Sequence, residues 1–584
     1  MLPKSLRPLF PYLKRYRTGF AWGALCVLLL NGLWVLFPQV LRRAVDDLNS
    51  GVTTQKLGRY ALMIIALVLA KGVFQFLTRW IVIGISRDIE FDLRNDLFQQ
   101  LERLSHSFYQ RTRTGDVMAR ATNDLNAVRA LLGPAIMYTA NTLVFTAMAL
   151  VFMFQISPKL TLYAFLPLPI ASIVIQYFGR QIHDRFEKIQ AMFSEISARA
   201  QENFSGARVI RAYVQEEPEI RAFETANREY ISRSLHLVRL MGMLWPTLEL
   251  MLGIAVVLVL WLGGREVVQN RISTGQFVAF LTYITQLTWP VIALGYVINL
   301  FQRGTASLGR IHEIMTVVPE IADTPEVAAA GAPEREIAGT IEFRNLNFSY
   351  EGTPVLHDIN LRIPAGTSLA IVGPTGSGKT TLVNLIPRVY DTDPGSVLID
   401  GIPIRRFPID FLRANIGFVP QETFLFSDTI RENIAFGKDD ATDTQIRAAA
   451  DAANIATDIE GFPDGFQTIV GERGITLSGG QKQRTAIARA ILRNPRILIL
   501  DDALSSVDTH TEEKILNHLR EVMRGRTTIF ISHRVSTVQN ADQIAVLHGG
   551  RIVEYGTHDE LLARHGYYAD LYDKQLLEEE LAEV

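Results

Sequence analysis

Residues 373–380 read Gly373-Pro-Thr-Gly-Ser-Gly-Lys379-Thr380. This stretch follows the strand-like run 368–372 and precedes a helical pattern that begins at Thr381. Glycines at this spacing let backbone N–H groups close around phosphate oxygens, and the N-terminus of the following helix adds a favourable dipole. Strand, loop and helix in this order are the context that the motif requires, so the sequence predicts a nucleotide-phosphate site on an α/β domain.

The side chains of this loop have separate predicted roles. Lys379 is expected to reach the β- and γ-phosphates of the nucleotide, and the Thr380 hydroxyl is expected to bind Mg²⁺. The apolar strand 496–500 ends at Asp501, where a carboxylate beside the phosphate loop orients the magnesium ion. Taken alone, Asp501 would be read as an ordinary aspartate at a strand end. Its place beside the phosphate loop is what predicts a role as a metal ligand. The predicted phosphate-binding residues are Gly373, Pro374, Thr375, Gly376, Ser377, Gly378, Lys379, Thr380 and Thr381.

The first half of the chain is much more apolar than the second. The 584 residues have a net charge of −2, which argues against a nucleic-acid binder. The mean hydropathy is +0.15, unusually high for a soluble protein. The lone cysteine, Cys26, excludes a disulfide within the chain and a cysteine-based metal site. No cleavable signal peptide is evident, so membrane insertion has to rest on internal helices.

Six apolar runs in this half are long enough to cross a bilayer. Basic residues precede the first run and are expected to stay in the cytoplasm. Six spans place both ends of this domain, and therefore both chain termini, on the cytoplasmic side. The predicted spans are 19–40, 60–83, 135–156, 160–179, 240–263 and 277–301.

Amphipathic helices are predicted between the spans on the cytoplasmic side. One apolar stripe recurs at helical spacing after the second span and another after the fourth. Each span is therefore expected to continue as a long helix into the cytoplasm and to pair with a returning helix, with stalk tips near 108–117 and 206–217. The alternative is a set of ordinary amphipathic surface helices. The two stripes are Ile89, Leu93, Leu97, Leu101 and Leu104, and Ile182, Phe186, Ile189, Phe193 and Ile196.

Three ionisable residues lie within the predicted spans: Lys71, Arg79 and Glu249. Charges inside a membrane are costly and often functional, so Lys71 and Glu249 are candidates for substrate contact. The alternative is that Arg79 snorkels to the interface and that Lys71 pairs with a group inside the bundle.

A segment rich in Pro, Ala, Glu and Gly separates the two halves without regular periodicity. The sequence therefore predicts a transmembrane domain over 1–315, a linker over 316–338 and a nucleotide-binding domain over 339–584.

The residues Leu477-Ser-Gly-Gly-Gln481, ahead of the Asp501 strand, resemble the signature motif of the ATP-binding-cassette family. Segment 468–474 resembles the exporter segment that contacts the stalk tips, and 505–508 resembles the dimer-contact loop. Six spans on the same chain ahead of this domain resemble the family's exporter architecture. Further matches are Tyr350 for the aromatic that stacks on adenine, Gln421 for the glutamine that touches Mg²⁺ and senses the membrane domain, and His533 for the switch histidine.

The resemblance implies a fold, cofactors and a partner. The fold is multi-domain: an all-α six-helix transmembrane domain with long cytoplasmic extensions, then an α/β P-loop ATPase domain with a helical subdomain. The cofactors are ATP and Mg²⁺, and the partner is a second half-transporter. Two such domains close around two ATP molecules, because each signature helix directs its N–H groups at the γ-phosphate bound by the other subunit. The implied signature contacts are Ser478, Gly479, Gly480 and Gln481, and the helical run after them is predicted to begin near Lys482.

One position departs from the family pattern. After Asp501 the family carries glutamate, the general base that polarises the attacking water, whereas this chain has Asp502. Aspartate is one methylene shorter, and a misplacement of about 1 Å can cost on the order of a hundredfold in rate. The combination resembles the subunit of heterodimeric exporters that carries the degenerate site. The alternative is a slow homodimer in which Asp502 still acts as the base.

The leading functional hypothesis is ATP-driven export of hydrophobic or amphipathic compounds across the cytoplasmic membrane. A lipid- or peptide-translocating exporter is the first alternative, and an ATP-gated regulatory subunit without transport is the second. An importer is disfavoured because its membrane and nucleotide domains are expected on separate chains. The six spans exclude a soluble cassette ATPase.

Overall fold

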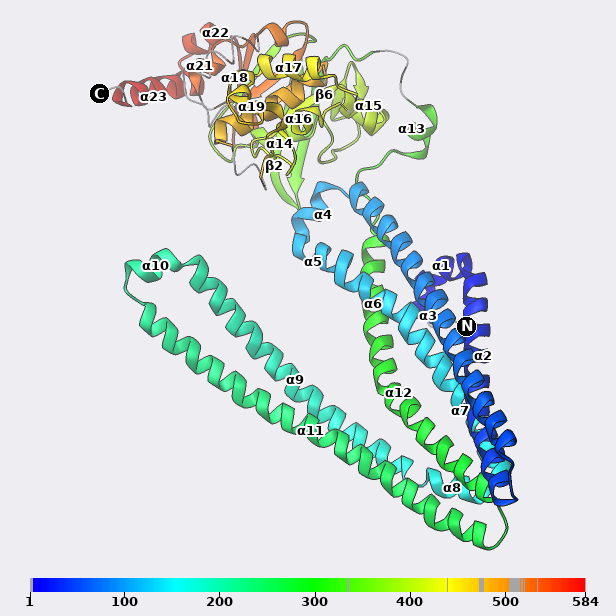
Figure 1. The fold of residues 1–584 in the computed structure, drawn as a ribbon. Coiled ribbons are helices and arrows are strands. Elements are labelled where there is room, and N and C mark those ends of the chain that lie inside the picture. Colours follow the sequence, from blue (N-terminus) through cyan, green and yellow to red (C-terminus); the bar gives the residue numbers. More distant parts are fainter. Residues whose placement is uncertain are drawn as a thin grey trace. The chain divides into compact units, whose positions relative to one another are not determined.

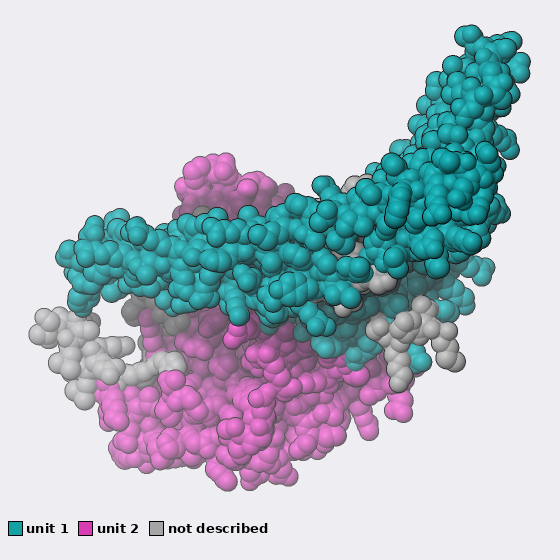
Figure 2. Space-filling view, turned by 90° about the horizontal axis from the view of Figure 1, so that it is seen from below, with its two compact units in different colours: residues 1–100, 115–316 teal, residues 101–114, 317–584 magenta. Residues whose placement is uncertain are grey.

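The computed structural model describes residues 4–582 except 332, 334, 335, 439, 472–476, 504–514, 516, 517, 519 and 533. The chain divides into two compact units, coloured teal and magenta in Figure 2. Unit 1 comprises residues 1–100 and 115–316, and unit 2 comprises residues 101–114 and 317–584. The short segment 101–114 therefore belongs to the same unit as the nucleotide-binding half, although it lies far from that half in the sequence.

Long helices make up unit 1 (Figure 1). Two π-helical segments, labelled η2 and η3, interrupt the third of these long runs. The elements are η1 (Lys4–Leu9), α1 (Phe10–Arg15), α2 (Arg17–Asn49), α3 (Thr54–Arg103), α5 (Thr114–Ala119), η2 (Arg120–Asp124), α6 (Leu125–Ala130), η3 (Leu131–Ala135), α7 (Ile136–Ile156), α8 (Pro158–Phe165), α9 (Leu168–Ser205), α10 (Ala207–Ala212), α11 (Glu216–Val268) and α12 (Thr274–Met315).

Several of these helices are longer than a bilayer requires. About 20 residues span the hydrocarbon core, whereas α3 has 50 residues and α11 has 53. Within the described residues, α2, α3, the run Thr114–Ile156 and α11 are long and apolar enough to cross a membrane. The fourth and sixth predicted spans fall mainly on α9 and α12, where several side chains lie outside the described set.

The two predicted cytoplasmic stripes behave differently. Every residue of the first stripe, from Ile89 to Leu104, is at most 9% exposed, so the prediction of a buried face is confirmed. In the second stripe Ile189 is buried, but Phe186 and Phe193 are 48% and 51% exposed. Helices α9 and α11 run side by side (Figure 1), so the predicted pairing of a long helix with a returning helix is confirmed, although large apolar side chains of this pair stay exposed in the single chain.

Lys71 on α3 has an aromatic partner. Its ammonium lies 3.9 Å from the centre of the Trp34 ring on α2, a cation–π distance. The Trp34 ring in turn stacks on Phe37. This arrangement fits the alternative in which Lys71 pairs inside the bundle.

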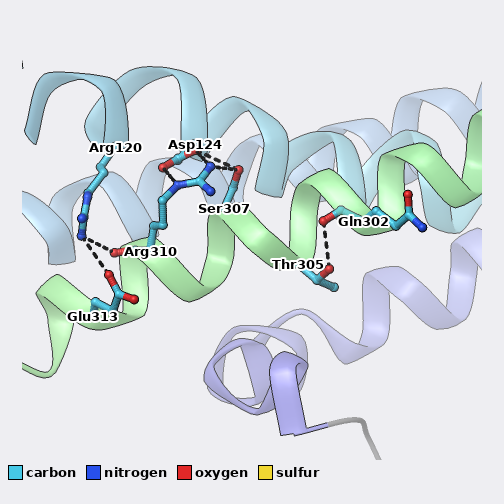
Figure 3. A network of polar contacts seen from close by, with 7 residues as sticks. All are labelled: Arg120, Asp124, Gln302, Thr305, Ser307, Arg310 and Glu313. Atoms are coloured by element: carbon cyan, nitrogen blue, oxygen red, sulfur yellow. Dashed lines mark hydrogen bonds and ion pairs between the residues drawn. The ribbon is translucent and has the colours of Figure 1, made fainter. Parts of the chain in front are cut away.

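A polar network fastens the C-terminal end of α12 to the helices that precede α7 (Figure 3). Asp124 is 7% exposed and accepts hydrogen bonds from the Ser307 hydroxyl and from Arg310 Nε, each at 2.8 Å. Arg120 donates to the Arg310 carbonyl at 3.0 Å and lies 3.3 Å from Glu313. A buried carboxylate needs such partners, because an unpaired charge out of water is strongly destabilising.

Unit 2 contains two sheets. A four-stranded antiparallel sheet has the order β2-β1-β4-β5, and a six-stranded sheet has the order β10-β9-β3-β8-β7-β6, with all neighbours parallel except β9 and β10. The strands are β1 (Ile341–Tyr350), β2 (Thr353–Ile363), β3 (Ser368–Val372), β4 (Val397–Ile399), β5 (Ile402–Pro403), β6 (Ile416–Val419), β7 (Ile497–Asp501), β8 (Thr527–Ile531), β9 (Gln543–His548) and β10 (Arg551–Gly556).

The helices of unit 2 are mostly short. One of them, the six-residue helix α13, lies inside the predicted linker, where the sequence showed no helical periodicity. The helical elements are α4 (His106–Arg111), α13 (Pro325–Ala330), α14 (Lys379–Asn384), η4 (Ile404–Arg406), α15 (Ile409–Ala414), α16 (Ile430–Ala435), α17 (Asp443–Ala452), α18 (Ala456–Glu460), η5 (Gly465–Gln467), α19 (Gly479–Leu492), α21 (Val535–Val538), α22 (His558–Ala563) and α23 (Tyr567–Ala582).

The five parallel strands of the six-stranded sheet are largely buried on both faces, as parallel strands are, whereas the antiparallel edge strand β10 is mostly exposed. Successive residues of β3 alternate between two apolar cores: Leu369 and Ile371 pack with the antiparallel sheet and α14, while Ala370 and Val372 pack with α16–α19. The central strands thereby hold the carboxyl ends of β3 and β7 at one edge. That edge is where the sequence places the phosphate loop and Asp501.

We expect Arg310→Met to lower the thermal unfolding temperature of the detergent-solubilised protein by roughly 3–5 °C, because Asp124 keeps its burial and loses its cation. Adding Asp124→Asn should recover part of the loss, since the uncompensated charge is then gone. Arg303→Met, a change at an exposed arginine of the same helix, serves as the control. A single variant as stable as this control would show that the network contributes nothing.

Candidate nucleotide site

The phosphate loop joins the end of β3 to α14 with three glycines in left-handed backbone conformations. Gly373, Gly376 and Gly378 have φ values of 148°, 80° and 99°. A Cβ on Gly373 would lie 2.0 Å from the Leu547 carbonyl oxygen on the neighbouring strand β9, so no other residue fits there. Helix α14 begins at Lys379, two residues earlier than predicted, so its first free N–H groups belong to the loop itself.

Lys379 is held at the mouth of this loop. The residue is only 7% exposed. Its ammonium group donates hydrogen bonds to the carbonyl of Gly373 at 2.8 Å and to the carbonyl of Pro374 at 3.0 Å. Burial lowers the pKa of Lys379, while the carboxylates of Asp501 and Asp502 oppose that shift. These two carbonyl contacts keep the cation beside the loop, at the position where the sequence places the phosphates.

Thr380 and Asp501 form the candidate metal centre. The Thr380 hydroxyl donates to Asp501 Oδ1 at 3.1 Å, and Asp501 is 1% exposed. Its other oxygen, Oδ2, is buried and has no hydrogen-bond partner among the described residues. Burial raises the pKa of Asp501 to about 6, as does the nearby Asp502, whereas Thr380 and Lys379 lower it. A buried oxygen without a donor beside a hydroxyl suits a hard divalent cation, so these residues fit Mg²⁺.

Asp502 follows with its backbone fixed on both sides. It has a φ of 49°, a left-handed value that aspartate tolerates better than most residues. Its N–H donates to the Ile531 carbonyl at 3.1 Å, and the Gln483 side-chain amide donates to its carbonyl at 3.4 Å. Gln483 was not predicted; it lies two residues after the signature, and only the fold turns it toward Asp502.

These groups line one cavity of about 190 Å³, whose lining includes most of the predicted phosphate and metal residues. Val355 and Ile531 form an apolar part of the cavity wall, and the sequence did not predict either residue. The predicted residues in the lining are Thr375, Gly376, Gly378, Lys379, Thr380, Thr381, Gln421, Asp501 and Asp502.

Tyr350 lies next to the same cavity, at the end of β1. Its hydroxyl donates to the Thr381 hydroxyl at 3.2 Å, and Thr381 lines the cavity. The Tyr350 ring also meets the rings of Phe348 and Tyr390 edge-on. The structure thus brings Tyr350 to the phosphate loop across 31 residues of sequence.

The signature residues begin α19 but lie away from this cavity. Ser478 caps the helix in a capping box: its hydroxyl accepts from Gln481 N–H at 3.2 Å, and the Gln481 side chain accepts from Ser478 N–H at 3.0 Å. The helix therefore starts at Gly479, three residues before the predicted start near Lys482. None of residues 478–481 lines the phosphate cavity.

Some predicted residues lie outside the described part of the chain. They are His533, the dimer-contact loop 505–508 and the end of the exporter segment, residues 472–474.

The sequence matches two family profiles in the expected order. Residues 20–291 match the ABC transporter transmembrane region, and residues 356–505 match the ABC transporter ATP-binding family. A relative from Bacillus subtilis (strain 168), the probable multidrug resistance ABC transporter ATP-binding/permease protein YheI, is 38% identical over 577 residues, 98% of each chain. This chain belongs to the ABC exporter family.

Other relatives carry different names. The ATP-dependent lipid A-core flippase of Syntrophus aciditrophicus (strain SB) is 38% identical over 97% of this chain and 93% of its own. The multidrug resistance-like ATP-binding protein MdlA of Escherichia coli (strain K12) is 37% identical over 95% and 94%. A bacterial Atm1-family ABC exporter solved with ATP bound has a TM-score of 0.80, 31% identity, and coverage of 96% of this chain and 98% of that chain.

Membership establishes the general properties of the exporter. It is a multi-pass membrane protein whose ATPase domain binds ATP, generally with Mg²⁺, and couples ATP hydrolysis to transport. Exporters of this type work as dimers in a lipid bilayer. The predicted family and fold class are therefore confirmed, and the roles of individual residues remain predictions.

We expect Asp501→Asn to remove the Mg²⁺-dependent part of ATP binding by this exporter. In the unchanged chain the carboxyl group carries its charge only above a pH of about 6, and Mg²⁺ needs the ionised form. The apparent Mg²⁺ affinity should therefore fall as the pH drops below that value, by up to about tenfold per pH unit.

Titration of Mg²⁺ into the ATP-bound protein, in steps from about pH 8 to about pH 5, measures this effect. The Asp501→Asn variant corrects for protonation of the nucleotide itself. Parallel curves for the two proteins would contradict the assignment of Asp501 as the metal ligand.

Proposed function

We propose that this chain is one subunit of a heterodimeric exporter that moves hydrophobic or amphipathic compounds across the cytoplasmic membrane. In this proposal the ATPase domain and both termini lie in the cytoplasm. The observation that carries the heterodimer is Asp502, in the position after the metal carboxylate.

In the proposed site, ATP lies in the cavity at the end of β3. Tyr350 stacks on adenine, residues 373–381 bind the phosphates, and Thr380, Gln421 and Asp501 hold Mg²⁺. When bound, Mg²⁺ neutralises charge on the β- and γ-phosphates. That Ser478–Gln481 are not among the residues lining this cavity supports a composite site, in which the signature helix of each subunit completes the ATP site of the other.

The geometry of Asp502 supports slow hydrolysis at the chain's own site. Two backbone hydrogen bonds, at 3.1 and 3.4 Å, fix the residue, so the main chain is not free to advance and offset the missing methylene. The carboxylate then falls short of the water that it would polarise. This site holds ATP longer than the other, whose base comes from the partner chain.

Exposed apolar side chains support a second chain beside α9 and α11. Phe186, Phe193 and Leu235 are about half exposed. They lie on the helical extensions beyond the apolar spans, where lipid tails would not cover them. A second half-transporter of the same architecture is the occupant that we propose for this face.

The substrate class rests on the relatives. Two relatives with full-length similarity are named as multidrug resistance proteins and one as a lipid A-core flippase, so amphipathic cargo is common to both names. Lipid or peptide translocation within the same architecture is the alternative. Uptake of a fluorescent amphiphile into inverted vesicles, dependent on ATP and on both chains, tests the proposal, and an ATP-binding subunit without any uptake would contradict it.

We expect Asp502→Glu to raise ATP turnover at this chain's own site by ~10- to 100-fold, because the longer side chain restores the reach of the base. Asp502→Asn should lower the residual turnover, and Asp451→Glu, an exposed change on α17, should leave it unaltered. Single-turnover hydrolysis in complexes whose partner site is inactivated isolates the relevant rate. Equal rates with aspartate and glutamate would remove the basis for the degenerate site.

A further inference from the structure

The segment that follows α3 contacts the ATPase unit around Tyr350. Gln110 Nε2, on helix α4, donates to the Tyr390 hydroxyl at 2.8 Å, and the His106 ring meets the Tyr390 ring edge-on at 5.8 Å. Tyr390 and the segment 101–114, which contains His106 and Gln110, all belong to unit 2. These contacts join residues about 280 positions apart in the sequence.

Tyr390 in turn touches Tyr350. The two ring centres lie 5.1 Å apart with an interplanar angle of 82°, so one ring presents its edge to the other. Phe348 completes the cluster, at 4.9 Å from Tyr350 and 5.9 Å from Tyr390. Three rings in mutual contact leave the plane of Tyr350 little freedom.

A second contact holds the turn that carries Tyr350. Glu351 and Gly352 have φ values of 48° and 86°, which form the tight two-residue turn between β1 and β2. Arg111 Nε donates to Glu351 at 2.6 Å, and the same guanidinium lies 3.6 Å from Glu320. Arg111 and Glu351 are well exposed, so this ion pair orients the turn rather than stabilising it strongly.

We propose that Tyr390 is a positioning residue for adenine recognition, and that helix α4 fixes it through Gln110. This proposal rests on the proposed role of Tyr350 as the adenine platform. Helix α4 follows directly on the second membrane helix in the chain, so the contact lets that part of the chain respond to the base of the nucleotide. The phosphates would be held by the loop 373–381, which meets the ring cluster through the hydrogen bond from the Tyr350 hydroxyl to Thr381 and not through the Tyr390 ring.

Binding and docking then strengthen each other. If α4 in place favours the ring orientation that stacks on adenine, adenine binding favours α4 in place by the same factor. A nucleotide without a base should bind the phosphate loop and leave α4 unaffected. This difference separates base recognition from a merely structural role.

The test compares ATP with inorganic tripolyphosphate, both with Mg²⁺, on the full chain in lipid nanodiscs together with its partner. We expect Tyr390→Leu to weaken ATP binding about five- to tenfold, and Tyr390→Phe and Gln110→Ala to weaken it about two- to threefold each. The Tyr390→Phe/Gln110→Ala double variant should be no weaker than either single one, because both remove the same bond. Tripolyphosphate affinity should not change in any variant.

Tyr555→Phe, on strand β10, is the matched control for loss of a tyrosine hydroxyl. Trypsin gives a second readout: cleavage after Arg111 or Arg113 should be slower with ATP than with tripolyphosphate, and Tyr390→Leu should remove that difference.

Each outcome has a defined meaning. Variants that bind both ligands more weakly, or that bind ATP as the unchanged chain does, would overturn the role of Tyr390. An unchanged chain that binds ATP no better than tripolyphosphate would instead overturn the proposed adenine platform at Tyr350.

Discussion

A buried carboxylate at the end of a central strand is the constraint around which the ATPase unit is arranged. Asp501 is almost fully enclosed, with one oxygen bonded to Thr380 and the other without a donor. Such a group is costly in a folded protein unless a cation joins it. The parallel sheet brings this carboxylate to the phosphate loop, because the carboxyl ends of β3 and β7 lie at one edge with only β8 between them. The site is thus built to be completed by a metal–nucleotide complex.

The membrane unit shows a comparable incompleteness on a larger scale. Its first cytoplasmic stripe is buried within the chain, and the network around Asp124 ties α12 to the helices before α7. Helices α9 and α11, by contrast, leave large apolar side chains exposed along their length. Apolar surface of this kind is stable in water only when another surface covers it. Both units are therefore consistent with a second chain. In the membrane unit the sign is the uncovered apolar face of α9 and α11, and in the ATPase unit it is a signature helix that does not line the phosphate cavity of its own chain.

The sequence predicted the parts of the site whose geometry is local. A strand, a glycine loop and a helix fix one another through neighbouring residues, so the phosphate loop could be located from Gly373 to Thr381. Asp501 could be found because strand ends in a parallel sheet share one edge. Helix starts were less accurate: α19 begins at Gly479 because Ser478 forms a capping box with Gln481, a choice that the two glycines obscured.

Residues that act through distant contacts could not be predicted in the same way. Gln483, Tyr390 and Gln110 carry no motif, and each finds its partner only through the tertiary fold. The exposure of Phe186 was missed for a related reason. Helical periodicity shows which residues share a face, but it does not show whether that face is covered by the same chain or by another.

The position of Asp502 connects these observations. A shorter base could in principle be offset by a shift of the main chain, but the backbone here is bonded to Ile531 on one side and to Gln483 on the other. Gln483 lies on α19, whose N-terminus carries the signature residues. The helix that would serve the partner's ATP thus also fixes the base of the chain's own site. In the proposed heterodimer, a movement of α19 that improved one site would disturb the other, so a slow site on this chain would go with intact support of the site on the partner. That division of labour is the physical argument for pairing this chain with an unlike partner.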